Sequence, residues 1–408
     1  MLDIKPFKGT KPYKEQAENL IAPSTDHLSE ESIIDIYEKN YWNYLKILNP
    51  VGKTKEEDAL KVAKNHFLEM KENHIIKKDC KPNYYIYQIK TTTHTQIGFL
   101  AITNIESFIS NKVKGHELTY ERRTQERADQ MLNIETQIGP IYVFYKDNNE
   151  LDNFILKLTI LNPEYEFLSF DNSMHTLWCV KNNSDIEKLT SLANKLEYLY
   201  IADGHHRIAA IRKLYQMKSS QNNHHTGSEG YNYFMISAFP KNQSRIYDYN
   251  RVIKDLNTLN VKEFISCIKE NFECENSSLP VRPKQIREFG MYHDGEWYLL
   301  KFKNESLLND DILSKLDINI IDNFCLKTIL GIKDVNTDDR IRFIAGSHRL
   351  DALEKKVNDN PDSVAFSIFP TKIDDVIEVA EINLTMPPKS TWFDPKPLDG
   401  LVVFEFVQ

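Results

Sequence analysis

The hydrophobic and polar positions predict strands and helices that alternate along most of the chain. Short apolar runs, rich in β-branched and aromatic residues, lie between polar or turn-forming segments; they cover residues 84–90, 97–102, 141–145, 177–180, 198–202 and 233–239. Runs of this length and composition are typical of β-strands. The polar segment 219–232 interrupts the pattern and predicts a loop.

The first part of the chain has helical spacing instead. Ser29 is suited to cap a helix whose first turn carries two glutamates. A second helical pattern puts Leu60, Phe67 and Met70 on one face. We interpret both as helices that pack into a core. A further helix is expected near residues 184–196.

The last third of the chain returns to strands. Residues 291–300 predict a hairpin that turns at Asp294-Gly295. Residues 364–369 predict a strand, and Thr371 with Asp374 three positions on resembles the capping box of a helix start. The chain closes on another apolar strand.

Mixed strands and helices predict an α/β fold of the mixed α+β class. We expect three parts: an N-terminal helical region at 1–80, a central core at 81–250 and a C-terminal α/β domain at 251–408. A strand, a turn and a helix around residues 203–207 lie in the central part and hold the most unusual chemistry of the sequence.

Composition narrows the function classes. The chain has 408 residues, of which 41% are hydrophobic and 27% charged, as in an ordinary globular protein. The net charge of −8 argues against a protein that coats nucleic acid. No apolar run approaches the roughly 18 residues of a membrane helix, and the N-terminus has no apolar signal core. The 5 cysteines are scattered and form no C-x-x-C pair, so we expect a cytoplasmic protein with reduced thiols.

The sequence ADGHHR crowds charged groups into a turn between strand and helix. Gly204 permits a sharp bend and a close approach to a ligand. The positive end of the helix dipole and the fork of Arg207 suit phosphate, and His206 adds a donor. Asp203 suits Mg²⁺ or a hydroxyl proton. We take Asp203 and His205 as candidate catalytic residues. The alternative is a capped helix with solvated charges.

This turn resembles the G-x-x-R-x-x-A phosphate turn of the ParB and sulfiredoxin superfamily. The resemblance implies a ParB/sulfiredoxin-like core whose turn cradles nucleotide phosphates, as in CTP-binding partition proteins, ATP-using sulfiredoxins and kinases of free serine. Sulfiredoxins carry a cysteine directly after the glycine, where this chain has His205. Partition proteins carry DNA-binding helices and a basic surface, which the net charge of −8 does not favour.

A second resemblance extends over nearly the whole chain. Blocks in the same order resemble a widespread bacterial family marked by ADGHHR: they read IKPFKGTKP, APSTD, GHELTYERR, GPIYVFY, YIADGHHR and MPPKSTWFDPKPLDGLV. The chain departs from the family at residues 22–26, where APSTD replaces APPYD. It also departs at Glu121-Arg122, where the family has a proline and an aspartate.

The segment 115–127 gathers further candidates. In a loop, His116 and Thr119 could contact a substrate, and Glu117 is our candidate general base for its hydroxyl. Arg123 and Arg127 are four positions apart, so on a helix they share a face that suits phosphate. The alternative is a solvated helix face with Glu/Arg pairs.

The proline-braced loop at 386–397 carries three more candidates, Lys389, Ser390 and Thr391. A lysine beside two hydroxyls suits a phosphate or the carboxylate of an amino acid, and prolines reduce the entropy lost when a ligand is held. The alternative is a packed turn anchored by the two aromatic residues that follow.

Three functions remain open from these residues. The leading hypothesis is a kinase that uses Mg²⁺, bound by Asp203, and ATP or ADP to phosphorylate a small hydroxyl metabolite, free serine first. The second is a regulatory protein that binds a nucleotide without phosphoryl transfer. The third is a metal-dependent hydrolase that uses Asp203, His205, His206 and His116. The expected partners are a nucleotide and a small molecule, without membrane or nucleic acid; a homodimer stays open.

Overall fold

The computed structural model describes residues 2–22, 30–49, 56–346 and 349–406. The chain forms two compact units. The first unit contains Met1–Gly115, Thr119–Ser244 and Pro395–Gln408, and the second contains His116–Leu118 and Arg245–Asp394. The N-terminal helices and the end of the chain both belong to the first unit. The three regions expected from the sequence stay a prediction.

A nine-stranded sheet forms the centre of the first unit. Its order is β6-β11-β8-β12-β5-β4-β10-β9, with β1 paired to β5. The strands are β1 (Ile4–Lys5), β4 (Tyr84–Lys90), β5 (Thr95–Asn104), β6 (Val113–Lys114), β8 (Ile141–Tyr145), β9 (Tyr165–Leu168), β10 (Met174–Val180), β11 (Leu199–Asp203) and β12 (Tyr233–Pro240). Most neighbours are antiparallel, but β12 runs parallel to β8 and β11 runs parallel to β6.

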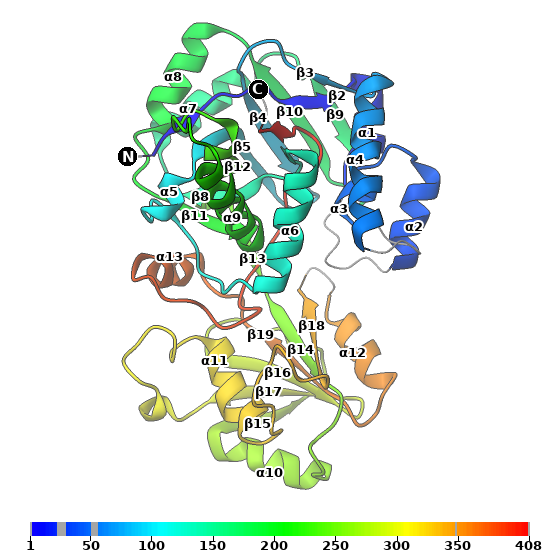
Figure 1. Cartoon of the computed structure of the whole chain (residues 1–408). Coiled ribbons are helices and arrows are strands. Elements are labelled where there is room, and N and C mark those ends of the chain that lie inside the picture. Colours follow the sequence, from blue (N-terminus) through cyan, green and yellow to red (C-terminus); the bar gives the residue numbers. More distant parts are fainter. Residues whose placement is uncertain (1, 23–29, 50–55, 347–348, 407–408) are drawn as a thin grey trace. The chain divides into compact units, whose positions relative to one another are not determined.

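The first unit also contains nine α-helices within its described residues. They are α1 (Ala17–Leu20), α2 (Glu30–Lys39), α3 (Leu45–Leu48), α4 (Glu56–Glu72), α5 (Glu106–Ile109), α6 (Glu121–Ile134), α7 (Asn149–Leu158), α8 (Asn183–Ala193) and α9 (His205–Gln221). Helices α6 and α9 lie side by side, and α9 packs on β8 (Figure 1). Two short pairings, β2 (Thr10–Pro12) with β3 (Ile76–Lys78) and β7 (Thr136–Gln137) with β21 (Phe404–Glu405), complete the unit.

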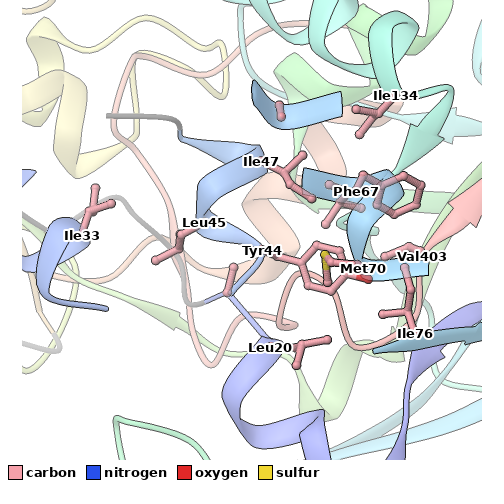
Figure 2. Packing of buried hydrophobic residues seen from close by; sticks show 13 residues of the cluster. Leu20, Ile33, Tyr44, Leu45, Ile47, Phe67, Met70, Ile76, Ile134 and Val403 are labelled. Atoms are coloured by element: carbon pink, nitrogen blue, oxygen red, sulfur yellow. The ribbon is translucent and has the colours of Figure 1, made fainter. Parts of the chain in front are cut away.

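The N-terminal helices share one buried cluster with the rest of the first unit. Tyr44, Phe67 and Met70 from the α3–α4 region pack with Ile134 of α6 and with Val403 near the end of the chain (Figure 2). Apolar burial of this kind stabilises a fold by roughly 25 cal/mol per Å². The expected N-terminal helical region is therefore part of the first unit's core.

The second unit is built on a six-stranded antiparallel sheet of order β15-β17-β16-β19-β14-β18. Its strands are β14 (Tyr249–Ile253), β15 (Phe272–Ser277), β16 (Glu288–His293), β17 (Glu296–Phe302), β18 (Ile341–Ala345) and β19 (Val364–Ile368), beside the pair β13 (Ile246–Tyr247) and β20 (Trp392–Phe393). Its helices are α10 (Val261–Asn271), α11 (Asp317–Ile321), α12 (Asp351–Asn358) and α13 (Ile373–Glu381), with a π-helix at Asp322–Lys327 after α11.

The predicted hairpin is present, and its turn has the expected conformation. Asp294 and Gly295 join β16 to β17 with φ angles of 49° and 79°. Positive φ at both positions characterises the type I′ turn, whose twist matches that of the strands it joins. The mixed α+β class predicted from the sequence is thus confirmed, with both compact units combining sheets and helices.

Two local predictions are wrong. The helix expected to begin with a Thr371 capping box has Lys372 at its N-cap and no side-chain cap, because the Thr371 hydroxyl donates to the carbonyl of Ser390 instead. The polar segment 219–232 is not a loop throughout, since α9 continues to Gln221. The predicted Ser29 cap lies outside the described residues.

Within the part of the chain that the structure describes, no helix has the length and apolar character needed to span a membrane.

Candidate functional site: the turn between β11 and α9

The ADGHHR sequence forms a tight connection between a strand and a long helix. Strand β11 ends at Asp203 after a register shift against β8, and α9 begins at His205. Gly204 between them has φ 102° and ψ 23°, a conformation that a residue with a Cβ adopts only with strain. The sequence therefore needs glycine here, and the turn brings the positive end of the α9 dipole to the end of β11.

Asp203 forms an ion pair with a residue that the sequence analysis did not select. The Lys396 Nζ atom lies 2.9 Å from the Asp203 carboxylate. The lysine side chain is 13% exposed, whereas that of Asp203 is 43% exposed. One indication of a role for Lys396 was present in the sequence, namely its position in the proline-braced loop 386–397. The pair puts an ammonium group and a carboxylate side by side at the turn.

Arg207 uses its fork to bind a carboxylate. Nη1 and Nη2 donate to the two oxygens of Asp399 over 2.8 and 2.5 Å, and Nη1 also donates to the carbonyl of Pro140 over 3.2 Å. The backbone of Gly139 lies so close to this pair that an added Cβ would overlap Arg207 Nη1 and Asp399 Oδ1, so a side chain there would displace the pair. Arg207 thus joins the first turn of α9 to the end of the chain and to the segment before β8.

The two histidines of the turn have different surroundings. His205 is 5% exposed, and its ring faces Gly115, where an added Cβ would be 3.2 Å from Cδ2. The ring of His206 stacks on Tyr120, with centroids 5.9 Å apart. The Tyr120 amide donates to Nε2 of His206 over 3.1 Å, which places a proton of the neutral ring on Nδ1.

The candidates between Thr119 and Arg127 lie near the start of α6. Arg123 and Arg127 share this helix as expected, but their environments differ. Arg123 is exposed, whereas Arg127 donates to the Leu48 carbonyl over 3.3 Å and to the Gln130 side chain over 3.2 Å. Thr119 is exposed. Arg127 therefore contributes to packing around the N-terminal helices.

The second unit brings together the other predicted residues. Nε2 of His116 lies 3.1 Å from the Thr391 hydroxyl, which donates to Glu117 over 3.4 Å. The amide of Met386 donates to the His116 carbonyl over 2.8 Å. Residues 116–117 thus form one polar cluster with Met386 and Thr391, although His116 and Thr391 are 275 positions apart in the sequence.

The remaining loop residues border this cluster. Ser390 is buried, and its hydroxyl donates to the carbonyl of Pro387 over 2.5 Å. Lys389 is exposed with φ 56°, and its Nζ atom lies 5.6 Å from the ring centre of Tyr249. Ser390 therefore braces the loop, while Lys389 keeps its ammonium group at the surface.

The side chains near the turn could bind Mg²⁺ only together with ligands from outside the protein. Among the residues that the structure describes, no three His, Cys, Asp or Glu side chains lie close enough together to hold one metal ion. Mg²⁺ is commonly bound by one or two carboxylates together with water and substrate phosphates. Asp203 fits that mode, in which water and the phosphates of a nucleotide supply the other ligands. Residues 23–26 of the APSTD block lie outside the described residues.

Several solved structures are similar to the chain. Free serine kinase in complex with AMP is similar with a TM-score of 0.35 and 11% identity, over 72% of this chain and 86% of that one. SbnI with a C-terminal truncation, from Staphylococcus aureus, has a TM-score of 0.39 and 9% identity, over 74% and 85%. A conserved hypothetical protein from Pyrococcus furiosus has a TM-score of 0.33 and 12% identity, over 74% and 93%.

No curated protein matches the chain. A family model does match, over residues 4–319. The chain belongs to the family described as protein of unknown function DUF1015.

Proposed function

We propose that this protein is a nucleotide-dependent kinase that phosphorylates the hydroxyl group of a small metabolite, with free serine as the first candidate substrate. The observation that carries the proposal is the turn between β11 and α9. There the left-handed Gly204 brings the positive end of a 17-residue helix next to the Asp203–Lys396 ion pair. A helix dipole and an ammonium group both favour phosphate at this place.

The groups of the turn suit distinct tasks in phosphoryl transfer. Lys396 and the start of α9 would neutralise the nucleotide phosphates, and Gly204 permits their close approach. Asp203 would hold Mg²⁺ together with those phosphates, and the ion would reduce the repulsion of an incoming oxygen. His205 is buried against Gly115, where it would support the turn from inside.

The reaction requires few covalent steps. The substrate hydroxyl oxygen forms a bond to the terminal phosphorus, while the bond from that phosphorus to its bridging oxygen breaks. The nucleotide leaves with one phosphate fewer, and a carboxylate accepts the hydroxyl proton. We assign this acceptor role to Glu117, whose carboxylate receives a hydrogen bond from Thr391. Lys389 and Thr391 are proposed to bind the substrate.

Arg207 receives a different role from the phosphate contact expected from the sequence. Its two-pronged contact with Asp399 supports a positioning residue that holds the start of α9 in place. Because both Nη atoms engage Asp399, Arg207 would have to give up that contact to bind phosphate. Lys396, in contrast, meets one oxygen of Asp203 and would be shared with the phosphates. His206, Arg123 and Arg127 stay proposed phosphate contacts, with Arg123 the more accessible arginine.

A binding-only function is the second candidate. Both charged residues of the turn, Asp203 and Arg207, have ion-pair partners within the first unit. A turn held in this way could bind a nucleotide as a signal and leave it chemically unchanged.

Phosphorus NMR distinguishes the two candidates. Purified protein is incubated with Mg²⁺, each common nucleoside di- or triphosphate, and a panel of hydroxyl metabolites that includes serine. We expect a phosphorylated metabolite, and a loss of at least about 100-fold in its rate of formation for Asp203→Asn and for Glu117→Gln. Arg122→Ala is the control, because Arg122 is 91% exposed and pairs only with Glu126 on its own helix among the contacts seen.

Nucleotide binding without any phosphorylated product would move the protein to the regulatory function. Product formed at an unchanged rate by Asp203→Asn would show that the kinase reaction takes place at another site.

A further inference from the structure

A cavity lies in the first unit, away from the Gly204 turn and toward the C-terminal end of α9. Its volume is about 370 Å³, within the range of small-molecule sites. Residues from the C-terminal parts of α6 and α9, from the loop that follows α9 and from the end of the chain line it. The turn at Gly204 is not part of this lining, so the cavity is separate from the proposed phosphate site.

The walls of the cavity are mainly apolar. Leu132 of α6 and Leu214 of α9 face it together with Tyr231 and Phe406. Leu214 and Phe406 are 2% and 8% exposed, so firm packing holds these walls. The Phe406 amide donates to the Glu135 carbonyl over 2.8 Å, which fixes the aromatic wall to the end of α6. A branched or aromatic hydrocarbon group matches such walls.

One pair of opposite charges lines the same cavity. Lys218 Nζ lies 3.1 Å from a Glu135 carboxylate oxygen, and their side chains are 34% and 48% exposed. An ion pair this exposed contributes little to stability, so exchange for new partners costs little. An ammonium group next to a carboxylate is complementary to a ligand that carries the same two charges side by side.

The other charged residue of the lining has a structural task. The Glu229 carboxylate accepts from the amides of Thr226 and Gly227 over 2.7 and 2.9 Å, and from the Asn232 side chain over 2.9 Å. These bonds close the loop after α9. They also keep a negative charge at the wall, which disfavours a ligand with a second carboxylate.

We propose that this cavity binds a free α-amino acid with a hydrophobic side chain. The ligand's carboxylate pairs with Lys218, its ammonium group pairs with Glu135, and its side chain lies between Leu132, Leu214 and the two aromatic rings. Lys218 and Glu135 each keep an ionic partner when the ligand binds. The apolar surfaces of the ligand and of the cavity are removed from water at the same time.

Calorimetric titration without nucleotide tests the proposal, so its failure leaves the kinase proposal untouched. The probes are leucine and phenylalanine, compared with leucinamide, N-acetylleucine and glutamate. We expect binding of the first two, and affinities lower by about tenfold or more for the other three, each of which lacks a required charge or carries an unwanted one.

Two lysines of α9 provide a matched pair of variants. Lys218→Met should weaken leucine binding about tenfold or more. Lys213→Met should leave it unchanged, since Lys213 pairs with Glu121 at the other end of α6 and does not line the cavity. Glu135→Gln tests the ammonium partner independently, and circular dichroism verifies that each variant is folded.

Three results would overturn the proposal. They are the absence of heat with both amino acids, equal affinity for leucine and leucinamide, and equal affinity in the Lys218→Met and Lys213→Met variants. Binding of uncharged hydrocarbons alone would assign the cavity to apolar ligands instead.

Discussion

At the scale of single residues, the first unit contains a buried lysine that neutralises two acids. Lys11 is 1% exposed and lies 2.9 Å from both Asp79 and Glu164. The Tyr85 hydroxyl donates to the same Asp79 carboxylate over 2.7 Å. Charges buried in this way are compatible with a stable fold only when each has its partner, because removal of one partner leaves an uncompensated buried charge. Lys11 therefore belongs to the architecture and not to the catalytic residues.

Removal of this lysine should be costly. We expect Lys11→Met to lower the free energy of unfolding by about 3–5 kcal/mol, since two largely buried carboxylates lose their cation. Lys181→Met is the control: Lys181 is 69% exposed and lies 3.8 Å from Glu164, so its loss should cost about 1 kcal/mol or less. Urea unfolding measures both. Equal costs would contradict the buried-charge interpretation.

A buried histidine predicts how stability depends on pH. His175 is 2% exposed, and its ring stacks against those of Tyr87 and Phe167. Burial lowers the pKa of His175 to about 4 from an ordinary value of 6.5, although the charge of Asp171 opposes this effect. The unfolded chain therefore binds a proton at a pH where the folded protein does not.

The stabilising effect of neutral His175 is complete above about pH 6.5 and is lost as the pH falls toward 4. We expect this single group to account for about 3 kcal/mol over that interval. Unfolding free energies at several pH values, for the wild type and His175→Gln, give the slope. The variant should lose less stability on acidification; identical slopes would show that His175 is not buried in its neutral form.

At the scale of elements, long apolar runs predicted the strands inside the sheet, whereas strands of two residues could not be predicted from the sequence. Residues 84–90 and 141–145 were predicted as strands and form β4 and β8 with those bounds. Both lie inside the sheet, where continuous apolar runs are expected. Pairs of two residues such as Ile4–Lys5 have no periodicity to read, since only the neighbouring strand defines them.

Capping at Thr371 shows a different limit. Its spacing to Asp374 satisfies the capping pattern, but the hydroxyl donates to Ser390, which lies 19 positions away. A helix start can be recognised from local sequence only when no distant acceptor competes for the capping side chain.

The turn at Gly204 makes a prediction at the same scale. Gly204→Ala places a Cβ on a residue with φ 102°, which should destabilise the protein by about 1–2 kcal/mol and weaken ADP binding. Gly295→Ala, at φ 79° in the hairpin of the second unit, provides a control with similar backbone strain. It should leave ADP affinity unchanged. Calorimetry with ADP and thermal unfolding give both quantities, and equal ADP affinities in the two variants would argue against a phosphate site at Gly204.

At the scale of the whole molecule, distant segments complete the candidate site. Asp399 meets Arg207 across 192 positions, and Lys396 from the same segment meets Asp203. The sequence indicated the ADGHHR turn because its charged residues are crowded and adjacent to glycine. It could not indicate the two partners, because no local pattern tells which lysine or aspartate of a proline-rich loop returns to a given turn.

The division into compact units also depends on contacts between segments that are distant in the sequence. The α3–α4 region is helical, as the spacing of Phe67 and Met70 predicted, but its core partners are Ile134 and Val403. Such contacts depend on the fold of the complete chain. The mixed α+β class could therefore be predicted from the sequence, whereas the core partners of the N-terminal helices and the ion pairs of the turn required the structure.

The measurement that tests the central claim most directly is the binding of ADP to the wild type and to Lys396→Met, by calorimetry at a fixed salt concentration. The account predicts that the wild type binds ADP. It also predicts that Lys396→Met lowers the affinity for ADP by about tenfold or more, because an ionic contact to phosphate is lost. Lys213→Met, which removes an equal charge elsewhere in the first unit, should bind as the wild type does. Equal affinity in all three proteins, or no binding by any of them, would contradict a phosphate site at the turn between β11 and α9.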